Sequence, residues 1–179
     1  MTDPLEQARP SRTRADWVRL VAYWAFTGIV AWEMAAGGLW DLLRIEYVRV
    51  IMKHLGYPMY VLDVIGAWKI PCALVLILPR WRRLKEWAYA GAVFNYTGAT
   101  ASHLAVGDGP GRWVGPAIFA AFALASWALR PPARRLGGAE GAGATRLEWA
   151  VTIALLAVML VAAYFTLPQG PPPGYGPVP

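Results

Sequence analysis

The chain has 179 residues, of which 57% are hydrophobic and only 16% are charged, and its formal net charge is +6. Soluble domains usually carry about 25% charged residues, and here the apolar residues form runs long enough to cross a bilayer. An ordinary soluble globular domain is therefore excluded. A nucleic-acid-binding protein is excluded too, because the Lys and Arg residues cluster at the ends of the apolar runs and form no basic stripe.

Five apolar segments predict an all-α, polytopic membrane helix bundle. A polar N-terminal segment, residues 1–16, precedes the first of them. Each segment is close to the roughly 20 residues that span the hydrocarbon core. The predicted spans cover residues 17–39, 60–78, 86–106, 113–129 and 147–167. The first four form a predicted transmembrane core over residues 17–130, and the last is an additional transmembrane helix.

The connecting segments differ in character. Residues 41–57 carry an apolar residue at every third or fourth position, which predicts a short interfacial helix. Residues 131–146 are rich in glycine and proline and predict a flexible linker. Residues 168–179 contain six prolines and no charge, which predicts an extended, solvated, external tail.

The distribution of Lys and Arg predicts the orientation. Twelve of them lie at the N-terminus, between spans two and three, and between spans four and five, against four in the alternate loops. The positive-inside rule then places the N-terminus in the cytoplasm and the C-terminal tail outside. The predicted location is the cell (inner) membrane, with the lipid bilayer as the immediate partner.

Ionisable residues inside the predicted spans are candidate site residues, because charges at that depth are costly and usually face the bundle interior. Glu33, Lys69 and His103 come from spans one, two and three, and Asp63 lies at the start of span two. A rise of about 1.5 Å per residue puts Glu33 and Lys69 roughly 12–14 Å below the outer boundary. The sequence therefore predicts one polar cavity in the outer half of the membrane.

Asn95 belongs to the same candidate cavity, because it shares a small and polar helical stripe with Ser102 and His103. A purely structural alternative stays open, in which Glu33 and Lys69 form an ion pair that holds spans one and two in register. The two interpretations are evenly balanced on the residues alone.

Cysteine and histidine usage narrows the chemistry. The chain has a single cysteine, Cys72, so an intramolecular disulfide is impossible, and its apolar flanks favour a small buried side chain over a nucleophile. The two histidines, His54 and His103, have no ligand-like spacing, so no metal site is predicted.

Four separated blocks resemble the DoxX-like family in the expected order. They are residues 54–58 (HLGYP), 66–69 (GAWK), 84–91 (LKEWAYAG) and 102–108 (SHLAVGD), within a match over roughly residues 20–130. The resemblance implies a four-helix membrane bundle, which leaves the fifth span and the tail outside it. Many relatives carry Phe-Asp where this chain has Phe94-Asn95, and an amide cannot exchange a proton as that aspartate could.

The resemblance implies a broad range of functions, because members of the family are linked to quinone-coupled sulfur oxidation, to membrane redox complexes and to receptor assembly. Two functional hypotheses follow, one from the polar cavity and one from the fifth helix and the tail. In the first, the protein is a membrane subunit of a redox system that binds a quinone or another lipophilic ligand in the polar cavity. No haem, flavin or iron–sulfur motif occurs, so electrons would come from a protein partner. The residues do not decide whether the chain itself is an enzyme or only an oxidoreductase-associated subunit.

In the second hypothesis the protein is a non-enzymatic membrane partner or assembly factor, acting through the fifth helix and the proline-rich tail. It would then bind a protein partner or a second copy of itself, and the buried charges would only specify helix pairing. A solute or proton pathway ranks last, because the polar candidates are confined to the outer half.

Overall fold

The computed structural model describes residues 13–136 and 144–175, and the regular secondary structure in this part of the chain is all helical. Its elements are α1 (Arg14–Leu42), α2 (Glu46–His54), α3 (Tyr60–Ile77), α4 (Arg82–Ala105), α5 (Pro110–Leu129), the short 3₁₀ helix η2 (Pro132–Arg134) and α6 (Arg146–Phe165). The predicted membrane helix bundle is confirmed, and each predicted span corresponds to one helix. The N-terminal segment 1–12 lies outside the described residues, as does part of the linker, 137–143.

Local sequence explains where the helices begin and end. Thr13 and Thr145 each form a capping box, in which the Thr hydroxyl accepts from the backbone N–H three residues later and an acidic side chain, Asp16 or Glu148, accepts in return. Gly107 has φ +79°, a conformation that stops α4 and that glycine adopts without strain. The capping of Thr13 extends α1 beyond the predicted start at residue 17.

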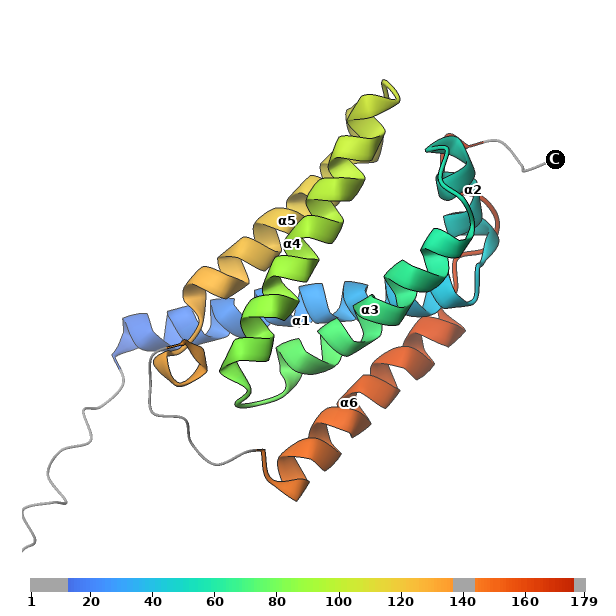
Figure 1. Ribbon diagram of the computed structural model, residues 1–179. Coiled ribbons are helices and arrows are strands. Elements are labelled where there is room, and N and C mark those ends of the chain that lie inside the picture. The colour runs from blue at the N-terminus through green and yellow to red at the C-terminus, as the bar shows by residue number, and fades with distance from the viewer. Residues whose placement is uncertain (1–12, 137–143, 176–179) are drawn as a thin grey trace, which may run out of the picture.

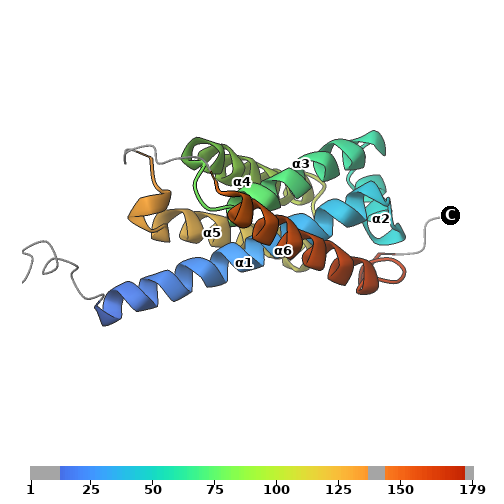
Figure 2. The same cartoon turned by 90° about the horizontal axis from the view of Figure 1, so that it is seen from below.

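Four helices form an antiparallel ring, in which α1 contacts α3 and α5, and α4 contacts α5 and α3. Helix α6 lies outside this ring against α1 and α3 (Figures 1 and 2). The core is lined by small and aromatic side chains of the ring helices. Among its members are Val30, Met34, Ala73, Tyr89, Ala92, Tyr96 and Ala123. Helix α6 is therefore an addition to a four-helix core, as the family resemblance implied.

Four described helices are long and apolar enough to cross a membrane: α1, α3, α5 and α6. Helix α4 is 24 residues long but more polar, so the membrane crossing of the third predicted span, over residues 86–106, stays a prediction. It contacts α3 and α5, and two of its polar side chains, Lys85 and His103, are buried inside the bundle.

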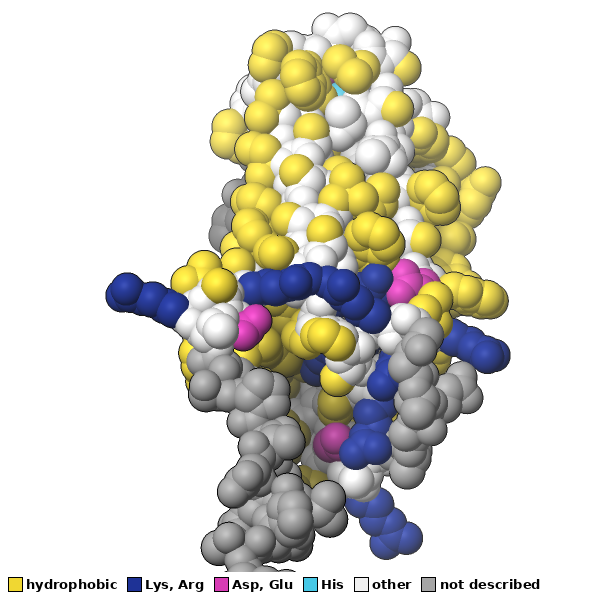
Figure 3. All heavy atoms as spheres, turned by 90° about the vertical axis from the view of Figure 1, so that its left-hand side faces the viewer, with side chains coloured by type: hydrophobic (Ala, Val, Ile, Leu, Met, Phe, Trp, Pro, Cys, Tyr) yellow, Lys and Arg dark blue, Asp and Glu magenta, His cyan; other side chains and the backbone are white. Residues whose placement is uncertain are grey.

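Basic side chains gather at the end of the bundle that carries the start of α1, and we call it the basic end. Figure 3 shows Lys and Arg side chains around this end and hydrophobic side chains covering the rest of that face. The turn between α3 and α4 lies here, and two of its residues, Arg80 and Trp81, have positive φ. Helix α6 holds this turn, because Arg80 pairs with Glu148 at 3.1 Å and Trp81 packs edge-on against Trp149.

Candidate functional site

A cluster of charged side chains lies where α1, α3 and α4 meet. The ammonium of Lys69 is 3.1 Å from Asp41 Oδ2 and 3.6 Å from Glu33 Oε1. The hydroxyl of Tyr96 donates a hydrogen bond to the other oxygen of Glu33. Asp41 is only 5% exposed. The structure therefore confirms that Glu33 and Lys69 lie together, and it adds two partners that the sequence analysis missed.

The spacing along α1 explains this cluster. Glu33, Gly37 and Asp41 are four residues apart and share one helical face. A Cβ atom on Gly37 would lie 2.8 Å from Glu33 Oε1 and 3.0 Å from Lys69 Nζ, so a larger residue here would displace the ends of both side chains. The spacing of two carboxylates around a glycine could thus have predicted from the sequence that Asp41 joins the cluster. Tyr96 had no such signal, because its role depends on how α4 is rotated.

A groove of about 540 Å³ lies between α3 and α4. The two helices are joined by a tight turn at the basic end and diverge away from it (Figure 1). The walls of the groove are almost entirely apolar and include Val64, Ile65, Val75, Leu84, Ala88 and Gly91. Trp68 and Trp87 line it as well, although they are 74% and 78% exposed. Such a shape suits an elongated lipophilic molecule.

Asn95 and Lys69 bring polarity to this groove. Asn95 lies next to Tyr96 on α4, but its side chain faces the groove while the Tyr96 hydroxyl reaches Glu33. Within the described residues the Asn95 amide forms no hydrogen bond. Cys72 also lines the groove, and its thiol donates a hydrogen bond to the Ala88 carbonyl oxygen at 3.3 Å. The thiol therefore packs against α4. An unpaired amide in apolar surroundings is an anchor for a polar group of a ligand.

Two predicted site residues lie elsewhere. Asp63, in the first turn of α3, forms a two-point ion pair with Arg44, which lies in the turn after α1. The Arg44 Nε donates to Asp63 at 2.9 Å. His103 Nδ1 lies 2.7 Å from Asp108 Oδ2 at the end of α4. The predicted single outer cavity is therefore divided into an ion cluster, a groove and two separate pairs, because the side chains leave their helices in different directions.

Asp108 organises a second polar cluster at the end opposite the basic end. Its carboxylate contacts His54 Nε2 at 2.9 Å and accepts from Arg112 at 2.6 Å, in addition to His103. Arg112 also donates to the Gly174 carbonyl oxygen and stacks on the Tyr175 ring. The tail was predicted to be extended and solvated, but its described part packs back on α2 and α5 because Arg112 offers it a hydrogen bond and a cation–π contact.

This cluster predicts a pH dependence of stability. Partial desolvation raises the pKa of Asp108, but hydrogen bonds from His103, Arg112 and His54 outweigh it and hold that pKa well below its ordinary value of 3.8. A depressed carboxyl pKa contributes stability above the ordinary value, and the contribution is lost as the pH falls toward the folded-state value. Asp108→Asn is therefore expected to be less stable than wild type at pH 7.

The gap between wild type and this variant should narrow as the pH falls below about 3.8, because the unfolded-state carboxyl then binds a proton while the folded-state carboxylate, with its lower pKa, keeps its charge. Thermal unfolding in mild detergent from pH 3 to pH 7 measures the difference. A constant gap between wild type and variant at every pH would show that the carboxylate charge does not hold this cluster together.

Further buried polar groups lie nearer the basic end, and the sequence analysis missed them. Lys85 is fully buried and donates to the carbonyl oxygens of Val75 and Leu76, the latter at 3.0 Å. It thus caps carbonyl groups near the C-terminal end of α3 with hydrogen bonds. Its position among the residues of a basic loop hid this role. The hydroxyls of Thr27, Ser126 and Tyr89 form another network, with two links of 2.7 Å.

Over residues 13–136 and 144–175, no three His, Cys, Asp or Glu side chains are grouped so that they could hold a metal ion. The polar groups in or near the apolar groove are an amide, a phenol and an ammonium, all of which can form hydrogen bonds. The arrangement suits binding of a lipophilic molecule with a polar head.

Comparisons with known proteins support the architecture. The model of the DoxX-like family matches residues 25–126, a range that runs from α1 to near the end of α5. It leaves α6 and the tail outside, as the sequence resemblance did. Neither the search of curated proteins nor that of solved structures produced a match. The family match covers more than half of the chain and the helices are those of a multi-pass membrane protein, and so the chain belongs to the DoxX-like family.

Proposed function

We propose that the protein binds a quinone or another lipophilic ligand in the groove between α3 and α4, as a membrane subunit of a redox system. The observation that carries the proposal is the apolar groove of about 540 Å³ with the unpaired Asn95 amide on its wall. A ligand would place its apolar part along α3 and α4 and its polar head against Asn95. Lys69 also lines the groove, and its partner Glu33 accepts a hydrogen bond from Tyr96.

Asn95 suits a carbonyl or hydroxyl head group better than a charged one. Its amide offers two donors and one acceptor oxygen and carries no charge. Lys69 lines the groove too, but its ammonium charge is compensated by Glu33 and Asp41. A quinone has the matching features, a pair of carbonyl acceptors on an apolar ring with an apolar tail. Reduction of such a ligand would need electrons from a protein partner.

Asn95→Leu is expected to weaken ligand binding about 2-fold to 12-fold, which corresponds to one hydrogen bond of 0.5–1.5 kcal/mol. The affinity is measured by titrating the detergent-solubilised protein with a short-chain benzoquinone and following tryptophan quenching, since Trp68 and Trp87 line the groove. Mass spectrometry of lipophilic molecules that copurify with the protein gives the second readout.

Phe94→Leu is the matched control, because Phe94 precedes Asn95 on α4, is 74% exposed and does not line the groove. It should bind the benzoquinone as wild type does. Equal affinity in wild type and Asn95→Leu would remove Asn95 from the site. The absence of both benzoquinone binding and any copurified ligand would overturn the proposed function itself.

The alternative function, a non-enzymatic assembly factor, is supported by the position of α6. Helix α6 lies outside the four-helix ring and leaves large apolar side chains exposed, including Leu147, Val158 and Phe165. Deleting residues 131–179 would separate the two functions. A partner lost with α6 while the four-helix core still binds benzoquinone would assign the partner contact to α6. The described tail is a weaker docking segment, because Arg112 already holds Gly174 and Tyr175.

A further inference from the structure

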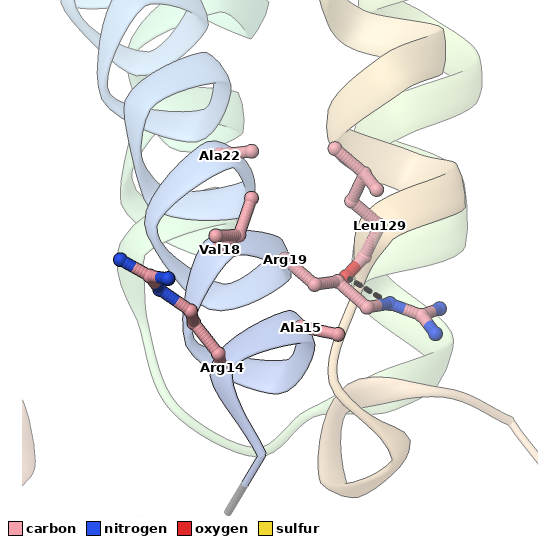
Figure 4. Close-up of a pocket in the computed structure, with 6 residues that line it drawn as sticks. All are labelled: Arg14, Ala15, Val18, Arg19, Ala22 and Leu129. Carbon is pink, nitrogen blue, oxygen red and sulfur yellow. Dashed lines mark hydrogen bonds between the residues drawn. The ribbon is translucent and has the colours of Figure 1, made fainter.

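A second cavity lies at the basic end, between the first turns of α1 and the last residue of α5. It is an open crevice of about 600 Å³. Ala15, Val18 and Ala22 lie on one face of α1, and Leu129 of α5 lies on the other side of the crevice (Figure 4). The lining is almost wholly apolar at a place where the basic side chains of the bundle begin.

Guanidinium groups flank this crevice. Arg14 and Arg19 line it and extend to opposite sides of it in Figure 4. Arg19 donates to the carbonyl oxygens of Leu129 and Ala128 at 3.4 Å, and Arg135 donates to the same Ala128 oxygen at 3.1 Å. Two cations therefore converge on the carbonyl end of α5.

Neither Arg19 nor Arg135 forms an ion pair with a carboxylate in the described part of the chain. The acidic residue nearest in sequence to Arg19, Asp16, is engaged in the capping box with Thr13. By contrast, Arg130 is paired with Glu86 and Arg80 with Glu148. Among the described residues, no carboxylate pairs with the charge of Arg19 or Arg135, and Arg19 lines the apolar crevice.

We propose that this crevice is a binding site for an anionic phospholipid. One acyl chain lies between Val18, Ala22 and Leu129, and the phosphate lies against Arg19 and Arg135. Planar guanidinium groups bind phosphate oxygens at two points. Basic pockets between transmembrane helices are known to attract anionic head groups, and each nearby Lys or Arg contributes about 1 kcal/mol. The site is separate from the groove between α3 and α4 and does not depend on its ligand.

The test compares phosphatidylglycerol with phosphatidylcholine of the same acyl chains, added to the delipidated full-length protein in neutral detergent. Native mass spectrometry counts the bound lipids and measures the affinity of each. We expect phosphatidylglycerol to bind more tightly than phosphatidylcholine. The double variant Arg19→Gln/Arg135→Gln should lose about 30-fold of the affinity for phosphatidylglycerol, because it removes two of the attracting charges.

The matched control removes the same net charge at the other end of the bundle. Arg49→Gln/Lys53→Gln replaces two exposed cations of α2 and should leave the lipid preference unchanged. Ala22→Phe, which fills the crevice, should weaken binding of both lipids. Equal affinity of wild type for the two lipids, or equal losses in both double variants, would overturn the proposal. Competition by inorganic phosphate at millimolar concentration would also overturn it, since it would indicate an ion site without an acyl chain.

Discussion

Lys69→Met is expected to lower the free energy of unfolding by about 3–5 kcal/mol, the usual cost of removing one partner from a buried ion pair. The substitution keeps the length and the apolar stem of the side chain. It leaves Glu33 and Asp41 facing each other without the ammonium that lies 3.6 Å from one and 3.1 Å from the other. Two uncompensated carboxylates in a membrane-embedded bundle are costly, because the surroundings cannot hydrate them.

The measurement is detergent-induced unfolding followed by tryptophan fluorescence. Lys53→Met is the control, because Lys53 is exposed on α2 and its loss should change stability by no more than about 0.5 kcal/mol. Neutralising both carboxylates in the Lys69→Met background, with Glu33→Gln and Asp41→Asn, should recover most of the loss. A Lys69→Met protein as stable as wild type would show that the cluster is solvated and not a buried charge network.

Gly66→Ala is expected to destabilise the protein by about 1–3 kcal/mol, the range for overpacking a tight contact. A Cβ atom on Gly66 would lie 2.8 Å from the Gly38 carbonyl oxygen and 2.8 Å from Leu42 Cγ. The first of these atoms belongs to the backbone of α1 and cannot move alone, so α1 and α3 would have to separate. Their separation would also pull Lys69 away from the carboxylates on α1.

Gly28→Ala is the matched control, since a Cβ atom on Gly28 of α1 would meet nothing within 4 Å. Alanine favours a helix over glycine by about 0.5–1 kcal/mol, so this variant should be neutral or slightly stabilised. The same unfolding assay applies to both variants. If Gly66→Ala matched Gly28→Ala, the close approach of α1 and α3 would not contribute to stability.

The blocks that resemble the DoxX-like family acquire physical roles in the structure. Each holds a residue that ties two parts of the bundle together. These residues are His54 in the first block, Gly66 and Lys69 in the second, Lys85 in the third, and His103 and Asp108 in the fourth. The residues that carry the family resemblance are thus also the contacts that hold α1 to α5 in one arrangement.

The sequence by itself determined the membrane-embedded, all-helical class, the approximate position of each long helix and the gathering of positive charge at one end. These features depend on local composition, because a long apolar run must form its hydrogen bonds within a helix when it lies in lipid. Helix ends depend on local sequence as well. Thr13 and Thr145 cap the helices that follow them, and Gly107 adopts the positive φ at the end of α4.

Only the tertiary structure decided which polar side chains meet. Glu33 and Lys69 were paired correctly because both lie deep in neighbouring spans, but Asp41 and Tyr96 complete their cluster through the rotation of α1 and α4. Asn95 and Tyr96 are adjacent in sequence, yet one faces the groove and the other the core. The apolar runs of the sequence set the depth of a residue in the membrane. Packing against the neighbouring helices decides which of them its side chain faces.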